Sequence, residues 1–328
     1  MQLRNWLMAL LLLTAAPALA DEDKDKSEPV IHATPAMWTV HGPKGTAYLL
    51  GSVHALPKNV EWQTPIIKTA VKRANTFVFE IPMSGDARDH GALLLAANVL
   101  LPPSVSLPSY FDADMRNEFR AAVEHTQIDA EGLVGVRPWF AAKELEDAMS
   151  GKLTSHSEDG VDNKIYAMAE KRGIHDVRAF ETPEFQVHAL KGDANTKNEL
   201  ALLRVAMKKA ATKPMVPAKK LLDAWAAGDP DALAGIMVAS QSPEERQTIL
   251  DDRNHNWIPK IEKMLTEKRT FFITVGAAHL AGPGGVPELL RQAGYKVDGP
   301  YVSEAPATEH RGMSARAEPD LRPANPAD

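Results

Sequence analysis

Two segments far apart in the chain share one pattern, an apolar run followed by Gly-x-x-His. Residues 49–54 read LLGSVH and residues 274–279 read TVGAAH. A glycine lets the backbone turn sharply as a strand ends, and side chains just beyond strand ends form the sites of α/β folds. A single copy arises often by chance, and its histidine is then structural. Two copies favour imidazoles, from His54 and His279, that converge on one divalent metal.

Glu80 is the third candidate ligand, because it ends the otherwise apolar run 77–81 (FVFEI). A carboxylate there is costly to bury without a metal, a cation or a strong donor. A set of His54, His279 and Glu80 is suited to Mn²⁺, Co²⁺ or Zn²⁺ in a hydrolytic site, where the metal acidifies a bound water. The alternative is an ion pair between Glu80 and an arginine such as Arg253.

Three further polar residues are candidate catalytic groups. Glu181 follows the run 177–180 (VRAF), and its carboxylate is a general base, a ligand or a residue that orients one. Arg253, ahead of Trp257 in a helical pattern, neutralises Glu80 or clamps a substrate carboxylate, unless it is a surface charge. Asp162 precedes another helical pattern, and a simple N-cap is the competing interpretation.

A mixed α/β fold is predicted to position these residues. Short β-branched or aromatic runs indicate strands at 37–40, 47–50, 77–81, 177–180 and 271–275, and the turn 42–45 (GPKG) makes the first two a hairpin. Helical patterns lie between and after them. We therefore expect a central mixed β-sheet flanked by helices, with a helix-rich middle and a polar loop over 191–217. The predicted helices are 64–75, 91–101, 112–125, 138–149, 162–172, 183–191, 217–227, 230–239, 243–266 and 286–293.

The composition restricts the classes of protein and site. The chain has 328 residues and no cysteine, which excludes disulfide scaffolds, thiol nucleophiles, zinc fingers and iron–sulfur sites. Any metal must therefore bind histidine, carboxylate or other oxygen ligands. The formal net charge of −6 argues against a nucleic-acid partner.

The two ends of the chain differ from the rest. Residues 1–20 combine Arg4, a short apolar run and an Ala-Leu-Ala cleavage site, as in a secretory signal peptide. Because the run is too short to span a bilayer comfortably, an N-terminal membrane anchor is the weaker alternative. We expect a mobile charged segment over 21–29, one folded domain over 30–302 and a disordered tail over 303–328. The mature protein would be periplasmic or secreted, without a stable membrane span.

Several motifs taken together resemble the TraB/GumN family. They are YLLGSVHALP (48–57), FVFE (77–80), GVD (160–162), FETPEFQ (180–186), Arg253-Asn254 with Trp257, and VGAAHLAG (275–282). The resemblance implies kinship with Tiki metalloproteases and, more distantly, with erythromycin esterases and haem-binding ChaN-type proteins. It also implies that His54, Glu80 and His279 fall on metal or catalytic positions, whereas the roles of Asp162, Glu181 and Arg253 are open.

We therefore expect an exported metal-dependent hydrolase that acts on a peptide or protein substrate, by analogy with Tiki. Glu181 is the expected general base. The alternative is a non-catalytic periplasmic binding or accessory protein for haem or for an envelope or exopolysaccharide component. A third hypothesis makes both Gly-x-x-His motifs structural turns, with the protein acting through its surface.

Overall fold

The computed structural model describes residues 29–53, 56–149, 160–191, 196–212, 218–240 and 243–301. His54 and the predicted signal peptide and tail lie outside these residues. The chain groups into two compact units, each assembled from separate segments. Unit 1 holds 84–154 and 181–220, and unit 2 holds 28–83, 155–180 and 221 onward. The expectation of a single domain over 30–302 stays a prediction.

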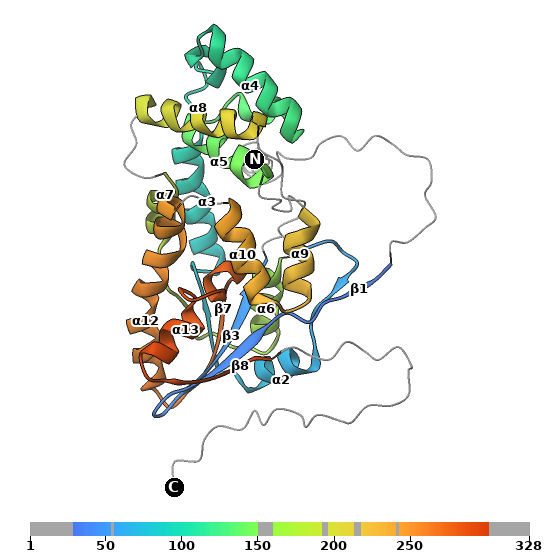
Figure 1. Ribbon diagram of the computed structural model, residues 1–328. Coiled ribbons are helices and arrows are strands. Elements are labelled where there is room, and N and C mark those ends of the chain that lie inside the picture. Colours follow the sequence, from blue (N-terminus) through green and yellow to red (C-terminus); the bar gives the residue numbers. More distant parts are fainter. Residues whose placement is uncertain are drawn as a thin grey trace, which may run out of the picture. The chain divides into compact units, whose positions relative to one another are not determined.

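Unit 2 is built on a six-stranded mixed sheet with the order β6-β5-β7-β3-β2-β8. Four adjacent strands of this sheet are parallel to one another, namely β6, β5, β7 and β3. Strand β2 is antiparallel to both β3 and β8. The carboxyl ends of the four parallel strands therefore meet at one edge (Figure 1). The strands are β2 (Met37–His41), β3 (Thr46–Ser52), β5 (Thr76–Phe79), β6 (Val177–Ala179), β7 (Thr270–Gly276) and β8 (Lys296–Tyr301).

These strands confirm the predicted fold class and the predicted hairpin. The apolar runs that indicated β2, β3, β5, β6 and β7 all form strands within a residue or two of the expected ends. The sequence pattern missed β8, because Gly299 and Pro300 interrupt it. Its place at the edge of the sheet beside β2 tolerates both residues, since only one side of β8 is paired.

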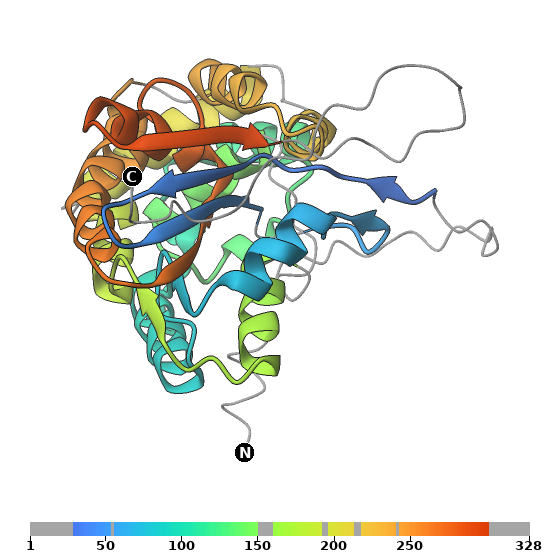
Figure 2. The same cartoon turned by 90° about the horizontal axis from the view of Figure 1, so that it is seen from below.

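Helices cover the two faces of this sheet (Figure 2). On one face, side chains of β3 and β7 pack against Trp257 and Ile261 of α12 (Asp252–Leu265) and Leu290 of α13 (Val286–Gln292). On the other face lie α2 (Pro65–Arg73) and α6 (Val161–Lys171), both in contact with β7. Unit 2 also contains β1 (Ile31–His32), β4 (Val60–Glu61), α9 (Ala218–Ala226), α10 (Pro230–Ser240), α11 (Pro243–Arg246) and the π-helical segment η4 (Gln247–Asp251). Residues 218–220 of α9 belong to unit 1.

Unit 1 is helical and has its own apolar core, formed largely by α4, α5 and α8. Its elements are α3 (Gly85–Val99), η1 (Leu107–Tyr110), α4 (Ala113–Thr126), η2 (Glu131–Leu133), α5 (Pro138–Met149), α7 (Pro183–Lys191) and α8 (Thr196–Thr212). The predicted polar loop over 191–217 is wrong, because α8 occupies most of it. Leu203, Ala206, Met207 and Ala210 form a buried stripe at helical spacing, which the many lysines and threonines around it obscured.

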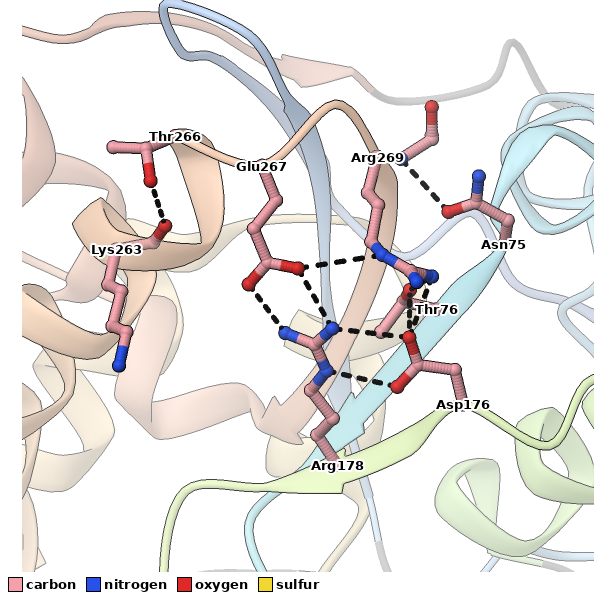
Figure 3. Close-up of polar contacts among 9 residues, drawn as sticks. Asn75, Thr76, Asp176, Arg178, Lys263, Thr266, Glu267 and Arg269 are labelled. Carbon is pink, nitrogen blue, oxygen red and sulfur yellow. Dashed lines mark hydrogen bonds and ion pairs between the residues drawn. The ribbon is translucent and has the colours of Figure 1, made fainter.

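The amino ends of β5, β6 and β7 are joined by a network of charges (Figure 3). The guanidinium of Arg178 donates to both oxygens of Glu267, at 2.7 and 2.9 Å, and to Asp176 at 3.0 Å. Arg269 Nη1 lies 2.8 Å from Asp176 Oδ2. Burial opposes the ionisation of Asp176, but the hydrogen bonds from Arg178 and Thr76 and the nearby arginine charges outweigh it, so its pKa is lowered. The hydrogen bonds from Arg178 likewise lower the pKa of Glu267.

Replacement of Arg178 by glutamine should destabilise the protein in a pH-dependent way. We expect the free energy of unfolding at pH 7 to fall by about 1 kcal/mol, the scale of a partly exposed ion-pair network. Because the folded pKa values of Asp176 and Glu267 are lowered, this stabilisation is complete above the ordinary carboxylate pKa of about 4 and is lost as pH falls through the folded values. Urea unfolding at several pH values measures it. Lys263→Gln, an equal change of charge on an exposed side chain, is the control. A difference in unfolding free energy between wild type and Arg178→Gln that stays constant down to pH 3 would contradict the lowered pKa values of Asp176 and Glu267.

Candidate functional site

The candidate site lies at the carboxyl edge of the sheet in unit 2, where the strand of the second motif runs beside that of the first. Gly51 of β3 is paired with Val275 of β7, so both motifs leave the sheet at the same edge. The neighbouring parallel strand β5 brings Glu80 to this edge. His279 follows β7 directly, in the short helix η5 (Ala277–Leu280), and is buried. The expectation that His279 emerges just beyond its strand is confirmed.

The two motif glycines are needed for space rather than for a sharp turn. Neither Gly51 nor Gly276 has a positive φ angle. A Cβ at position 51 would lie 2.9 Å from Ala277 Cα, and one at 276 would lie 3.2 Å from Glu80 Oε1. Each glycine therefore allows a close approach, of η5 to β3 in the first case and of Glu80 to the end of β7 in the second.

Glu80 is held through both carboxylate oxygens. Oε1 accepts a hydrogen bond from the backbone N–H of Gly276 at 2.7 Å, and Oε2 accepts one from Arg253 Nη2 at 2.6 Å. The side chains of Glu80 and Arg253 are only 13% and 10% exposed, so the ion pair is largely desolvated. The ion pair between Glu80 and Arg253, which the sequence offered as the alternative to metal binding by Glu80, is confirmed. The interpretation of Arg253 as a surface charge is wrong.

His279 is fixed through its Nδ1 atom. Nδ1 lies 2.6 Å from Oδ1 of Asn254, and the amide nitrogen of Asn254 donates to the carbonyl of Gly284 at 2.8 Å. With the amide nitrogen engaged in this way, Oδ1 accepts, so the hydrogen of the imidazole is assigned to Nδ1. In the neutral ring the lone pair is then on Nε2. The indole of Trp257 packs against the ring at a centroid distance of 4.4 Å and restricts its rotation.

The lone-pair nitrogen of His279 faces Glu80. Nε2 lies 3.8 Å from Glu80 Oε1, a separation that a cation about 2.0–2.2 Å from each atom can bridge. A neutral imidazole nitrogen and a carboxylate oxygen both present negative partial charge, so this arrangement favours a cation or proton between them. The two residues fit part of a His/carboxylate metal site. Across the part of the chain that the structure describes, no group of three histidine or acidic side chains is placed to hold a metal.

The other predicted site residues are His54, Asp162 and Glu181. His54 lies outside the described residues. Asp162 is the second residue of α6, and Gly160 occupies the N-cap position, so the N-cap interpretation of Asp162 is wrong. The start of α6 is tied to the first motif, since the N–H of Val161 donates to the carbonyl of Val53.

Glu181 is buried and its carboxylate accepts a hydrogen bond from the side-chain amide of Gln186 at 3.2 Å, but both residues belong to unit 1.

Asn254 and Trp257 are the site residues to which the sequence argument assigned no role. Both appear in the motifs quoted for the family resemblance, but in the sequence Trp257 only marked the helical pattern that holds Arg253. Asn254 and Arg253 are both buried on α12, and a buried amide requires polar partners. Only the structure reveals this burial. The π-helical segment η4 directly precedes these residues, as such segments frequently do at functional sites.

A model of the TraB/PrgY/gumN family matches residues 36–299. The chain belongs to this family. The matched region covers the sheet except the last two residues of β8, together with α12 and both Gly-x-x-His motifs of this TraB/PrgY/gumN protein. No curated protein and no solved structure matched the chain. Among its described helices, none has the length and apolar character needed to cross a membrane.

A double-mutant cycle tests the ion pair that holds Glu80. Arg253→Met and Glu80→Gln each leave a buried polar partner uncompensated, so each should lower the free energy of unfolding by about 3 kcal/mol. The double variant should lose clearly less than the sum of the two, because neither charge is then left buried and unpaired. Chemical denaturation measures all four proteins. Arg120→Met, on an exposed arginine of α4, should change little, and additive losses in the cycle would show that the two side chains act independently.

Proposed function

We propose that this TraB/PrgY/gumN protein is an exported metal-dependent hydrolase and that His279, Glu80 and His54 hold its divalent cation. One observation carries the proposal: Nε2 of His279, left with the lone pair by the bond to Asn254, faces Glu80 Oε1 at 3.8 Å. The position of the first motif on the neighbouring strand supports His54 as the third ligand.

The roles of the surrounding residues follow from their contacts. A divalent cation in such a site acts as a Lewis acid that polarises a carbonyl group and acidifies water. Arg253 and the N–H of Gly276 orient the Glu80 carboxylate, so that Oε1 stays directed toward His279. Asn254 keeps the hydrogen of His279 on Nδ1 and so keeps Nε2 available to a cation, as partners of metal-binding histidines do.

The remaining parts of the proposal rest on the sequence. The leader-like residues 1–20 support export to the periplasm or beyond. A peptide or protein substrate is inferred from the resemblance to Tiki metalloproteases. Glu181 is proposed as the general base, and Arg253 as the group that neutralises Glu80 or clamps a substrate carboxylate. Asp162 is a further candidate catalytic group.

Loss of either motif histidine should abolish metal binding. Each of the variants His54→Ala and His279→Ala is expected to lose the Mn²⁺, Co²⁺ or Zn²⁺ that the wild type retains, and with it the cleavage of a peptide library, because each removes one ligand. Elemental analysis of the purified proteins and product detection by mass spectrometry measure the two effects. His255→Ala, which removes an exposed histidine of α12, should retain both.

The outcomes of this experiment separate the alternatives. A wild type that binds no metal, with variants equal to it in activity and stability, refutes the hydrolase. Metal binding without cleavage of any peptide favours the binding or accessory protein, and haem titration with an absorbance band in the Soret region then identifies haem as its ligand. Loss of metal-dependent cleavage in Glu181→Gln, with metal retained, would support the general base.

Asn254→Ala should weaken the metal site without removing a ligand. We expect the affinity for the divalent cation to fall about tenfold to a hundredfold, because residues that orient a metal-binding histidine contribute on this scale. Asn254→Asp should restore most of the affinity, since a carboxylate oxygen also accepts from Nδ1–H. Competition with a chelator measures the affinity. Asn256→Ala, on the exposed face of the same helix, is the matched control, and an equal loss in both variants would exclude the orienting role.

A further inference from the structure

A cavity of about 530 Å³ opens in unit 2, next to the segment that follows the first motif. It lies between the short parallel strand pair β1–β4 and the first turn of α2. Trp62 and Leu56 contribute to its lining and are otherwise buried. The volume is in the range of pockets that bind small molecules.

The charged groups on the lining are mostly cationic. Lys58 comes from the loop after β3, Lys68 from α2 and Lys164 from α6, so three separate elements direct lysines to one cavity. Glu61 is the single carboxylate among the described lining residues, and it lies 3.3 Å from His32. The lining therefore carries an excess of two positive charges when His32 is neutral.

Two of these lysines, Lys58 and Lys68, are without an ion pair in the described part of the chain. Within the described part of the chain, neither Lys58 nor Lys68 forms a salt bridge or a side-chain hydrogen bond, and both are exposed. Lys58 and Lys68 together outnumber Glu61 on this lining, and such an excess of positive charge attracts an anion. Gln63 and Thr64 add neutral polar groups to the same wall.

We propose that this cavity binds a small ligand that carries carboxylate or phosphate groups. The ammonium groups of Lys58 and Lys68 bind its anionic groups, and Lys164 adds positive charge to the same lining. Such binding requires neither the metal nor hydrolysis, so the proposal goes beyond the proposed function and can hold if that function fails. Leu56 follows His54 by two residues, so a ligand in the cavity contacts the segment that carries the first motif.

Calorimetric titration of the full chain tests the proposal with two probes. Tri-glutamate supplies carboxylates and pyrophosphate supplies phosphates, while tri-glutamine amide is the neutral analogue. We expect at least one anionic probe to bind and the neutral analogue not to bind. Lys58→Gln and Lys68→Gln should each weaken binding about two- to fivefold, as loss of one partly exposed ion pair does. Lys72→Gln, the same change one turn further along α2 and away from the cavity, is the matched control.

Each outcome supports or overturns the proposal that the cavity binds an anion. Binding of either probe that weakens in Lys58→Gln and Lys68→Gln but not in Lys72→Gln supports it, and the probe that binds more tightly identifies the anionic group. Affinity should also fall as salt is raised. Absence of binding by both probes, equal binding of tri-glutamine amide, or an equal loss in Lys72→Gln would overturn it. The wild-type chain, after treatment with a chelator, should bind the anionic probe equally well. This control distinguishes a failure of the cavity proposal from a failure of the proposed metal site.

Discussion

The burial of the Glu80 carboxylate is the constraint on which the carboxyl edge of the sheet depends. A carboxylate at the end of an apolar strand is stable there only if each oxygen has a strong partner. The N–H of Gly276 and the guanidinium of Arg253 provide these partners, and they come from β7 and α12. The ion pair therefore fixes the end of β5, the end of β7 and the rotation of α12 relative to one another. The position of His279 follows from this arrangement.

Helix α12 connects the core of unit 2 to its site. Arg253, Asn254 and Trp257 are buried side chains of this helix. Arg253 holds Glu80, Asn254 holds His279, and Trp257 packs against both the imidazole and the Arg253 guanidinium. Further along, Ile261 and Leu265 enter the apolar core beneath the sheet. Packing in that core thus holds the polar side chains at the start of α12 in place.

Charged groups have different partners at the amino and the carboxyl ends of the parallel strands. At the amino ends, Arg178 and Arg269 are matched by Asp176 and Glu267, and the network is closed on itself (Figure 3). At the carboxyl ends, a carboxylate oxygen and an imidazole nitrogen face each other at 3.8 Å. A closed network contributes to stability, whereas facing acceptors favour a further positive partner. This difference is a physical reason to place the candidate site at the carboxyl edge.

The sequence by itself determined five strands of the central sheet, most of the helices and the positions of Glu80 and His279 just beyond strand ends, because short apolar runs and polar residues at their ends are local patterns. It failed at α8 and β8, where lysines and a Gly-Pro pair mask the periodicity. The tertiary structure decided the partners. Glu80 lies 173 positions from Arg253 and 196 from Gly276, and no local pattern encodes such a pairing. Likewise, the role of Asn254 depends on a bond to Gly284 that forms only when α12 packs beside the turn after β7. Hydrogen bonds of buried groups are set by packing, and packing is a property of the whole fold.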